Sequence, residues 1–279
     1  MKLVVLFFFV TILTANNIGY TEINASINPV VPASDAIEIS FLNDWTLTDV
    51  ALGLDILEGT GAFILWASDP VNNHMQAYDP ENADKLMSIS FDSQNTNCFG
   101  VVCNNNPDTD TYYTNDWMDD VLYYTENFGG AWITIANPAA NNARGMDFDG
   151  TDYWATNGAG GGLWRFQPGV SQENISTPEI TGQPSGLAVF PRGANLGIAI
   201  ATYTNFIFFY EWNGAIMTYI GSITCIPDCQ YPMGLTYAST TDTFFWTYVH
   251  NSEDYHLAEF SLEIMSLESS TWGSIKSSF

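Results

Sequence analysis

Short apolar and aromatic runs alternate with polar turns along the chain from about residue 36 onward. The runs are rich in Tyr, Phe, Trp, Val, Ile and Thr, and they are separated by Asn, Asp, Gly and Pro. No long stretch carries apolar residues at the three- and four-residue steps of an amphipathic helix. Runs of this kind are typical of short β-strands joined by tight turns. The pattern therefore predicts an all-β protein.

A glycine followed by an apolar residue recurs at a regular interval and marks the phase of a repeat. The five pairs are Gly53-Leu54, Gly100-Val101, Gly145-Met146, Gly186-Leu187 and Gly234-Leu235. Successive glycines are 47, 45, 41 and 48 residues apart by subtraction of these positions. A period of 40–50 residues with four strands in each period is typical of the blades of a β-propeller.

The fifth repeat contains three strand patterns, at 233–238, 243–251 and 256–264, where the other repeats contain four. One further strand pattern, 36–44, precedes the first repeat. We expect it to complete the fifth blade, because a closed ring leaves no long sheet edge unpaired. In the third repeat the outer strand is expected at 175–181. The predicted fold is a five-bladed β-propeller over residues 36–264, closed by an N-terminal strand. A six-bladed propeller and a β-sandwich are the alternatives.

Two hairpin segments carry a resemblance to known proteins. Residues 53–69 (GLDILEGTGAFILWASD) and 145–157 (GMDFDGTDYWATN) each contain an inner strand that reaches an Asp, turns through Gly and returns through a Trp. This resembles the recurrent first hairpin of exported bacterial β-propeller repeat proteins. The resemblance implies an architecture and no particular activity.

The N-terminus predicts export. Lys2 is followed by an apolar run over residues 3–13, which is too short for the roughly 20 residues of a membrane-spanning helix and is typical of a secretory signal peptide. We expect cleavage after Ala15 or as late as Gly19, and so assign residues 1–19 to the signal peptide. Residues 265–279 form a separate Ser-rich C-terminal tail. The expected location is outside the cell or at its surface, with no membrane span in the mature protein.

Four cysteines occur as two close pairs, Cys98 with Cys103 and Cys225 with Cys229. An even number of cysteines in an exported chain favours disulfides, and each pair flanks a turn-rich stretch. We therefore predict one local disulfide in each pair. A zinc site with four thiolate ligands is the alternative, although the usual Cys-x-x-Cys spacing is absent.

Charge limits the choice of partners. The chain has 31 Asp and Glu against 6 Lys and Arg, a formal net charge of -25 at pH 7. Nucleic acids and anionic lipid surfaces would repel such a chain. A hydrophobic fraction of 46% is far above that of disordered chains, so the protein is globular. We expect a monomer whose acids lie mostly in solvated turns.

Inner strands of a propeller line its central funnel, so the residue two places after each phase glycine is a candidate for chemistry. These residues are Asp55, Val102, Asp147, Ala188 and Thr236. Two carboxylates can suffice for glycoside hydrolysis, which makes Asp55 and Asp147 the candidate catalytic pair. An Asp at the end of a first strand is also favoured by the turn that follows.

Calcium is the one cofactor that the sequence suggests. Asp147, Asp149 and Asp152 alternate in the manner of a calcium loop, but the terminal Glu of the twelve-residue loop is missing. A tight Asp-Gly turn explains the same residues.

The leading functional hypothesis is a binding or structural module whose ligand, a protein or a carbohydrate, contacts the funnel face or the blade-edge loops. The alternative is a carboxylate-dependent, glycan-active enzyme that uses Asp55 and Asp147.

Overall fold

Twenty β-strands make up the part of the chain that the computed structural model describes, which is residues 36–59, 62–104, 111–126, 129–139, 142–159, 162–226 and 228–265. These residues contain no α-helix, and so none long and apolar enough to cross a membrane. The predicted signal peptide and residues 266–279 of the predicted tail lie outside the described residues.

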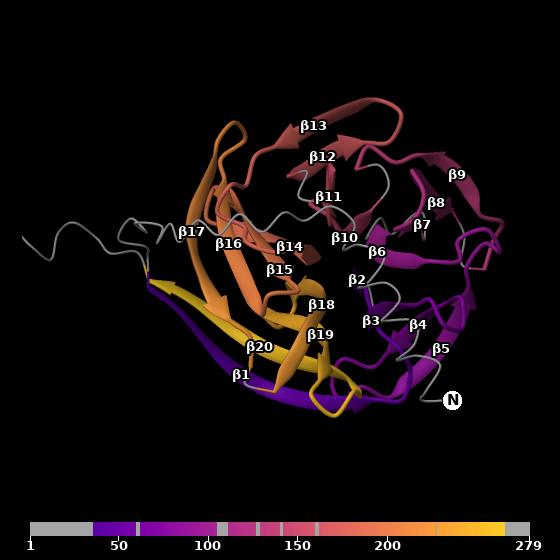
Figure 1. Ribbon diagram of the computed structural model, residues 1–279, viewed down its shortest axis with the longest axis horizontal. Coiled ribbons are helices and arrows are strands. Elements are labelled where there is room, and N and C mark those ends of the chain that lie inside the picture. The colour runs from indigo at the N-terminus through magenta and orange to yellow at the C-terminus, as the bar shows by residue number, and fades with distance from the viewer. Residues whose placement is uncertain are drawn as a thin grey trace, which may run out of the picture. The chain divides into compact units, whose positions relative to one another are not determined.

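The strands form five antiparallel sheets of four strands each, arranged as the blades of a propeller (Figure 1). Blade 1 contains β2 (Leu54–Gly59), β3 (Ala62–Asp69), β4 (His74–Tyr78) and β5 (Lys85–Ser90). Blade 2 contains β6 (Cys98–Asn104), β7 (Thr111–Asp116), β8 (Val121–Thr125) and β9 (Ile133–Ala136). Blade 3 contains β10 (Ala143–Phe148), β11 (Tyr153–Asn157), β12 (Leu163–Gln167) and β13 (Ser171–Ile175).

Blade 4 contains β14 (Pro184–Arg192), β15 (Asn195–Thr202), β16 (Phe206–Trp212) and β17 (Met217–Thr224). Blade 5 contains β18 (Cys229–Ala238), β19 (Thr243–His250), β20 (Tyr255–Met265) and β1 (Ala36–Leu47). The inner strands β2, β6, β10, β14 and β18 contact one another in that order, and β18 contacts β2, so the ring is closed (Figure 1).

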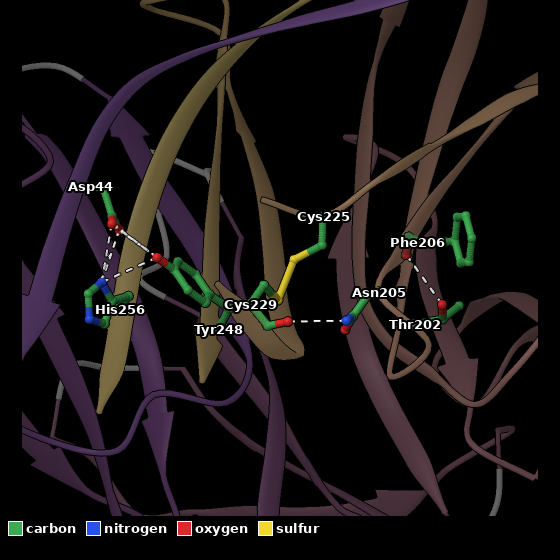
Figure 2. Close-up of a disulfide and its surroundings, with 8 residues drawn as sticks. All are labelled: Asp44, Thr202, Asn205, Phe206, Cys225, Cys229, Tyr248 and His256. Carbon is green, nitrogen blue, oxygen red and sulfur yellow. Dashed lines mark hydrogen bonds and ion pairs between the residues drawn. A yellow bond between two sulfur atoms is a disulfide. The ribbon is translucent and has the colours of Figure 1, made fainter. Parts of the chain in front are cut away.

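The N-terminal strand completes the last blade. β1 pairs with β20 from Ala36 opposite Met265 to Leu47 opposite Tyr255. Asp44 of β1 also accepts hydrogen bonds from the Tyr248 hydroxyl at 3.0 Å and lies 3.2 Å from Nδ1 of His256 (Figure 2). The predicted five-bladed propeller with this closure is confirmed, and neither a six-bladed propeller nor a β-sandwich fits five sheets in a ring.

The five phase glycines, Gly53, Gly100, Gly145, Gly186 and Gly234, form a ring in which each meets the backbone of the next blade; we call them the glycine ring. A Cβ atom on Gly234 would lie 2.5 Å from the carbonyl oxygen of Leu52 and 2.5 Å from the nitrogen of Leu54. Distances this short are not tolerated between a side chain and backbone. The repeat therefore keeps glycine at this phase because the inner strands approach too closely for any side chain.

Polar side chains on the second strands satisfy backbone groups of the glycine ring in three blades. Asn115 accepts a hydrogen bond from the nitrogen of Gly100 at 2.9 Å and donates one to the carbonyl oxygen of Arg144 at 2.8 Å. Ser68 in blade 1 and Thr247 in blade 5 make the same pair of bonds toward the next blade. Buried backbone groups at these junctions are thus paired across the blades.

The hydrophobic core lies between adjacent blades. One cluster joins blades 4 and 5, and three more join blades 3 and 4, 1 and 2, and 2 and 3. Trp66, Trp154 and Trp246 on the second strands of blades 1, 3 and 5 are among the largest fully buried side chains. Packing between blades therefore accounts for these tryptophans.

The predicted outer strand of blade 3, 175–181, is wrong. The outer strand is β13 (Ser171–Ile175), and its last residue, Ile175, is the first residue of the predicted strand. Gly169, with φ of 70°, and the hydrogen bond from the nitrogen of Val170 to the carbonyl oxygen of Gln167 turn the chain back at once after β12. Pro178 has no N–H to donate to a strand ladder, which favours a strand before it and not across it.

One of the two predicted disulfides is present. Cys225 and Cys229 are bonded, with Cα atoms 6.2 Å apart, and they bracket the link from β17 to β18 (Figure 2). The prediction that Cys98 pairs with Cys103 is wrong, because both are buried free thiols on β6. Five steps along an extended strand separate Cα atoms by about 16 Å, whereas a disulfide requires about 7 Å or less.

Candidate functional site

A cavity of about 660 Å³ lies where the inner strands end, and all five blades contribute to its lining. We call it the funnel cavity. Asp55, Cys103 and Asp147 reach it from β2, β6 and β10, while Phe190 and Tyr237 reach it from β14 and β18. Of the five residues two places after the phase glycines, Asp55 and Asp147 line this cavity, and the other three blades contribute neighbouring residues instead.

Asp55 joins three blades. Its Oδ2 accepts a hydrogen bond from the backbone nitrogen of Cys103 at 2.5 Å. Its Oδ1 accepts bonds from its neighbour Ile56 at 2.8 Å and from the hydroxyl of Thr236 at 3.1 Å. Because β6 and β18 lie on either side of β2, this one carboxylate ties blade 1 to both of its neighbours.

Asp147 repeats part of this arrangement in blade 3. Its Oδ2 accepts a hydrogen bond from the backbone nitrogen of Val189 in blade 4 at 2.5 Å, and its Oδ1 accepts one from Phe148 at 2.6 Å. Val102 and Ala188 occupy the same position in blades 2 and 4 and carry no polar group. The two carboxylates thus have a structural task as well as a place on the cavity floor.

Burial changes the acidity of both groups. Asp55 and Asp147 are only 4% and 7% exposed. Desolvation raises the pKa of Asp55 to about 7, although three hydrogen bonds oppose the rise. Desolvation and the charge of Asp55 hold the pKa of Asp147 well above its ordinary value. With a pKa of about 7 and a place on the cavity, Asp55 is able to exchange a proton near neutral pH.

The three calcium candidates bind separate partners. Asp147 contacts Val189, Asp149 accepts bonds from the backbone nitrogens of Thr151 and Asp152 at 2.8 Å, and Asp152 pairs with Arg165 at 2.5 Å. Within the described ranges no group of three His, Cys, Asp or Glu residues is placed to hold a metal ion. The segment is a tight turn around Gly150, whose φ is 93°.

Two charged residues of the cavity wall were not among the sequence candidates. Glu58 accepts hydrogen bonds from the backbone nitrogens of Ser239 and Thr240 at 2.8 Å, which ties β2 to the turn after β18. Burial acts to raise the pKa of Glu58, but these bonds hold it below its ordinary value. Arg165 reaches the cavity from β12, the third strand of its blade. Arg165 lies on the third strand of its blade, far along the chain from the phase glycine, so the sequence did not indicate that it would line the cavity.

No protein-family model matches the chain, and no curated protein sequence matches it. Solved structures do. The glutaminyl cyclase of Myxococcus xanthus is 12% identical with a TM-score of 0.58, over 82% of this chain and 97% of that chain. The PQQ-bound aldose sugar dehydrogenase of Streptomyces coelicolor is 12% identical with a TM-score of 0.55, over 82% and 99%. A chain of a nidogen/laminin complex is 12% identical with a TM-score of 0.50, over 72% and 73%.

These similarities establish the architecture and nothing beyond it. The chain shares its propeller fold with bacterial proteins of different activities, the cyclase and the dehydrogenase. A fold that hosts unrelated activities does not assign one, so function has to be argued from the site.

Proposed function

We propose that this protein is an exported binding module that takes a small polar ligand, such as a saccharide, into the funnel cavity. The observation that carries the proposal is the cavity itself. Its volume of about 660 Å³ falls within the range of small-molecule sites. Its lining combines carboxylates with the rings of Phe148, Phe190 and Tyr237, a mixture that suits stacking against a sugar face and hydrogen bonding to its hydroxyls.

Binding is favoured over catalysis by what the two floor carboxylates already do. Asp55 and Asp147 both accept backbone N–H groups across blade junctions, so each is held in one orientation by the frame of the ring. A rigid frame with variable loops at its rim is suited to recognition.

Export is supported by two features of the chain. The leader pattern at residues 1–19 is that of a secretory signal peptide. The Cys225–Cys229 disulfide is of the kind that persists in oxidising compartments.

A glycan-active enzyme is the second candidate, and one observation favours it. Asp55 and Asp147 interact electrostatically, and both pKa values are raised. A pair in which one carboxyl keeps its proton and the other is ionised is what a glycosidase requires of its acid and its base or nucleophile.

Calorimetric titration with a panel of mono- and oligosaccharides tests the proposal. Tyr237→Ala removes one half-buried ring from the cavity wall and is expected to weaken saccharide binding about tenfold, the equivalent of about 1.4 kcal/mol. Leu86→Ala, on the outer strand of blade 1 and 49% exposed, is the matched control and should bind as the wild type does. If no saccharide binds the wild type, the proposal is wrong.

Turnover of a polysaccharide that is lost in the Asp55→Asn, Asp147→Asn double variant would establish the enzyme instead.

A further inference from the structure

A buried arginine lies at the end of the inner strands opposite the funnel cavity. Arg144 directly precedes Gly145 of the glycine ring and is 2% exposed. Its guanidinium carbon lies 5.2 Å from the ring centre of Phe99 and 5.1 Å from that of Trp117. It donates a hydrogen bond to the carbonyl oxygen of Ala143 at 3.3 Å and another to the hydroxyl of Tyr203.

No carboxylate among the described residues lies within 4.0 Å of this guanidinium. Its Nε has no hydrogen-bond partner there either. A guanidinium stays charged even when burial lowers the pKa of Arg144. Two aromatic faces and two neutral oxygens offset part of the cost of burying that charge, but they supply no negative charge.

Two buried hydroxyl groups, in blades 4 and 5, also lack partners. Ser185, which is fully buried, precedes Gly186, and a Cβ atom on Gly145 would lie 2.9 Å from the Cα of Gly186. Tyr255, 7% exposed, interacts electrostatically with Tyr203 and with the buried carboxylate of Asp69. Neither the Ser185 Oγ nor the Tyr255 Oη makes a hydrogen bond. Each is a donor that an anion beside Arg144 would satisfy.

Half-buried aromatic rings lie around Arg144. Trp117 and Tyr203 both contact the guanidinium and are half-buried, as is Tyr231, whose ring centre lies 6.4 Å from that of Tyr203. These rings offer apolar faces to the non-polar part of a molecule bound beside Arg144.

From this geometry we infer that the end of the axis opposite the funnel cavity binds a small organic monocarboxylate, held by Arg144 with the hydroxyls of Tyr203, Tyr255 and Ser185. One guanidinium balances one negative charge, and a net charge of -25 disfavours ions of higher negative charge. The planar fork of the guanidinium matches a carboxylate with two parallel hydrogen bonds. This site is separate from the funnel cavity and does not depend on the function proposed for it.

Benzoate is the probe, with benzamide as its neutral counterpart and inorganic phosphate as the more highly charged anion. Titration of the full-length protein at constant ionic strength, followed by tryptophan fluorescence and by the melting temperature, should show millimolar or tighter binding of benzoate. We expect benzoate to raise the melting temperature. Benzamide and phosphate should bind at least tenfold more weakly.

Arg144→Met should abolish benzoate binding while the protein stays folded, because an apolar side chain replaces an unbalanced buried charge. Tyr203→Phe keeps the ring and the guanidinium and should weaken benzoate binding several-fold. Asp55→Asn, at the other end of the axis, should leave it unchanged. The inference is overturned if the wild type does not bind benzoate, if it binds benzamide equally well, or if Arg144→Met, still folded, binds benzoate as the wild type does.

Discussion

Blade 3 places an arginine near each end of the propeller axis, and the two differ in burial and in their charged partners. Arg165, on the funnel cavity, lies 2.5 Å from Asp152 and 3.7 Å from Glu173, with its guanidinium 5.8 Å from the ring centres of Trp154 and Trp212. Arg144 likewise lies over two aromatic rings, and the Nε of both arginines lacks a partner. Only Arg144 has no carboxylate beside it among the described residues.

The difference shows that the charges directly beside a side chain indicate a binding site better than the net charge of the whole chain does. In a chain with 31 acidic residues, three of the four lysines and arginines that the structure describes lie beside a carboxylate, namely Lys85, Arg165 and Arg192. A buried cation that finds none in such a chain marks a place where a negative charge from outside is accommodated. At the funnel end the imbalance has the opposite sign, since two buried carboxylates repel each other there.

The largest effect is expected from breaking the glycine ring that separates the two ends. Gly234→Ala should lower the free energy of unfolding by about 3 kcal/mol, because its Cβ would overlap the backbone of Leu52 and Leu54 and force blades 5 and 1 apart. Urea denaturation measures the change. Gly59→Ala is the matched control, since no atom lies within 4 Å of a Cβ built there. Equal stability of the two variants would contradict the role of the ring.

Substituting the two arginines tests their comparison directly. Arg165→Met should lower the free energy of unfolding by about 2 kcal/mol, because it leaves Asp152, which is 6% exposed, as an unpaired carboxylate. The value is reduced for the partial exposure of Arg165. Arg144→Met should change stability by less than about 1 kcal/mol, since it breaks no ion pair. A larger loss with Arg144→Met than with Arg165→Met, measured by the same denaturation, would reverse the comparison.

The smallest effect is expected in the pH dependence of the free energy of unfolding, through Asp55 at the funnel end of the axis. The pKa of Asp55 is about 7 in the folded protein against an ordinary value of 3.8, so the folded state holds this proton more tightly. Its contribution to stability is complete below pH 3.8 and is lost as pH rises through the window to about 7. Asp55→Asn removes this titration, so the stability of the wild type relative to the variant should fall between pH 3.8 and about pH 7.

Asp84→Asn, at an exposed carboxylate before β5, is the control and should leave the pH dependence of the wild type unchanged. A wild type and an Asp55→Asn variant with parallel stability curves across this range would show that Asp55 does not carry a raised pKa.

Much of the fold could be predicted because its signal is repeated. The phase glycines occur five times, so the blade count and the position of the inner strands did not depend on any one segment. The same phase put Asp55 and Asp147 on the funnel axis. The closing strand followed from a missing fourth strand in the last repeat, which β1 supplies. Two predictions that rested on a single local signal, the bounds of β13 and the Cys98–Cys103 disulfide, were wrong.

The sequence by itself determined the all-β class, the five blades and their phase, because alternation of apolar runs and turns is a local property that every repeat restates. Only the tertiary structure decided which charges are paired. Arg144 and Arg165 lie 21 residues apart in the same blade, and nothing in their neighbours along the chain distinguishes them. Their partners come from adjacent strands and blades, and so the contrast between the two ends of the axis arises only when the ring closes.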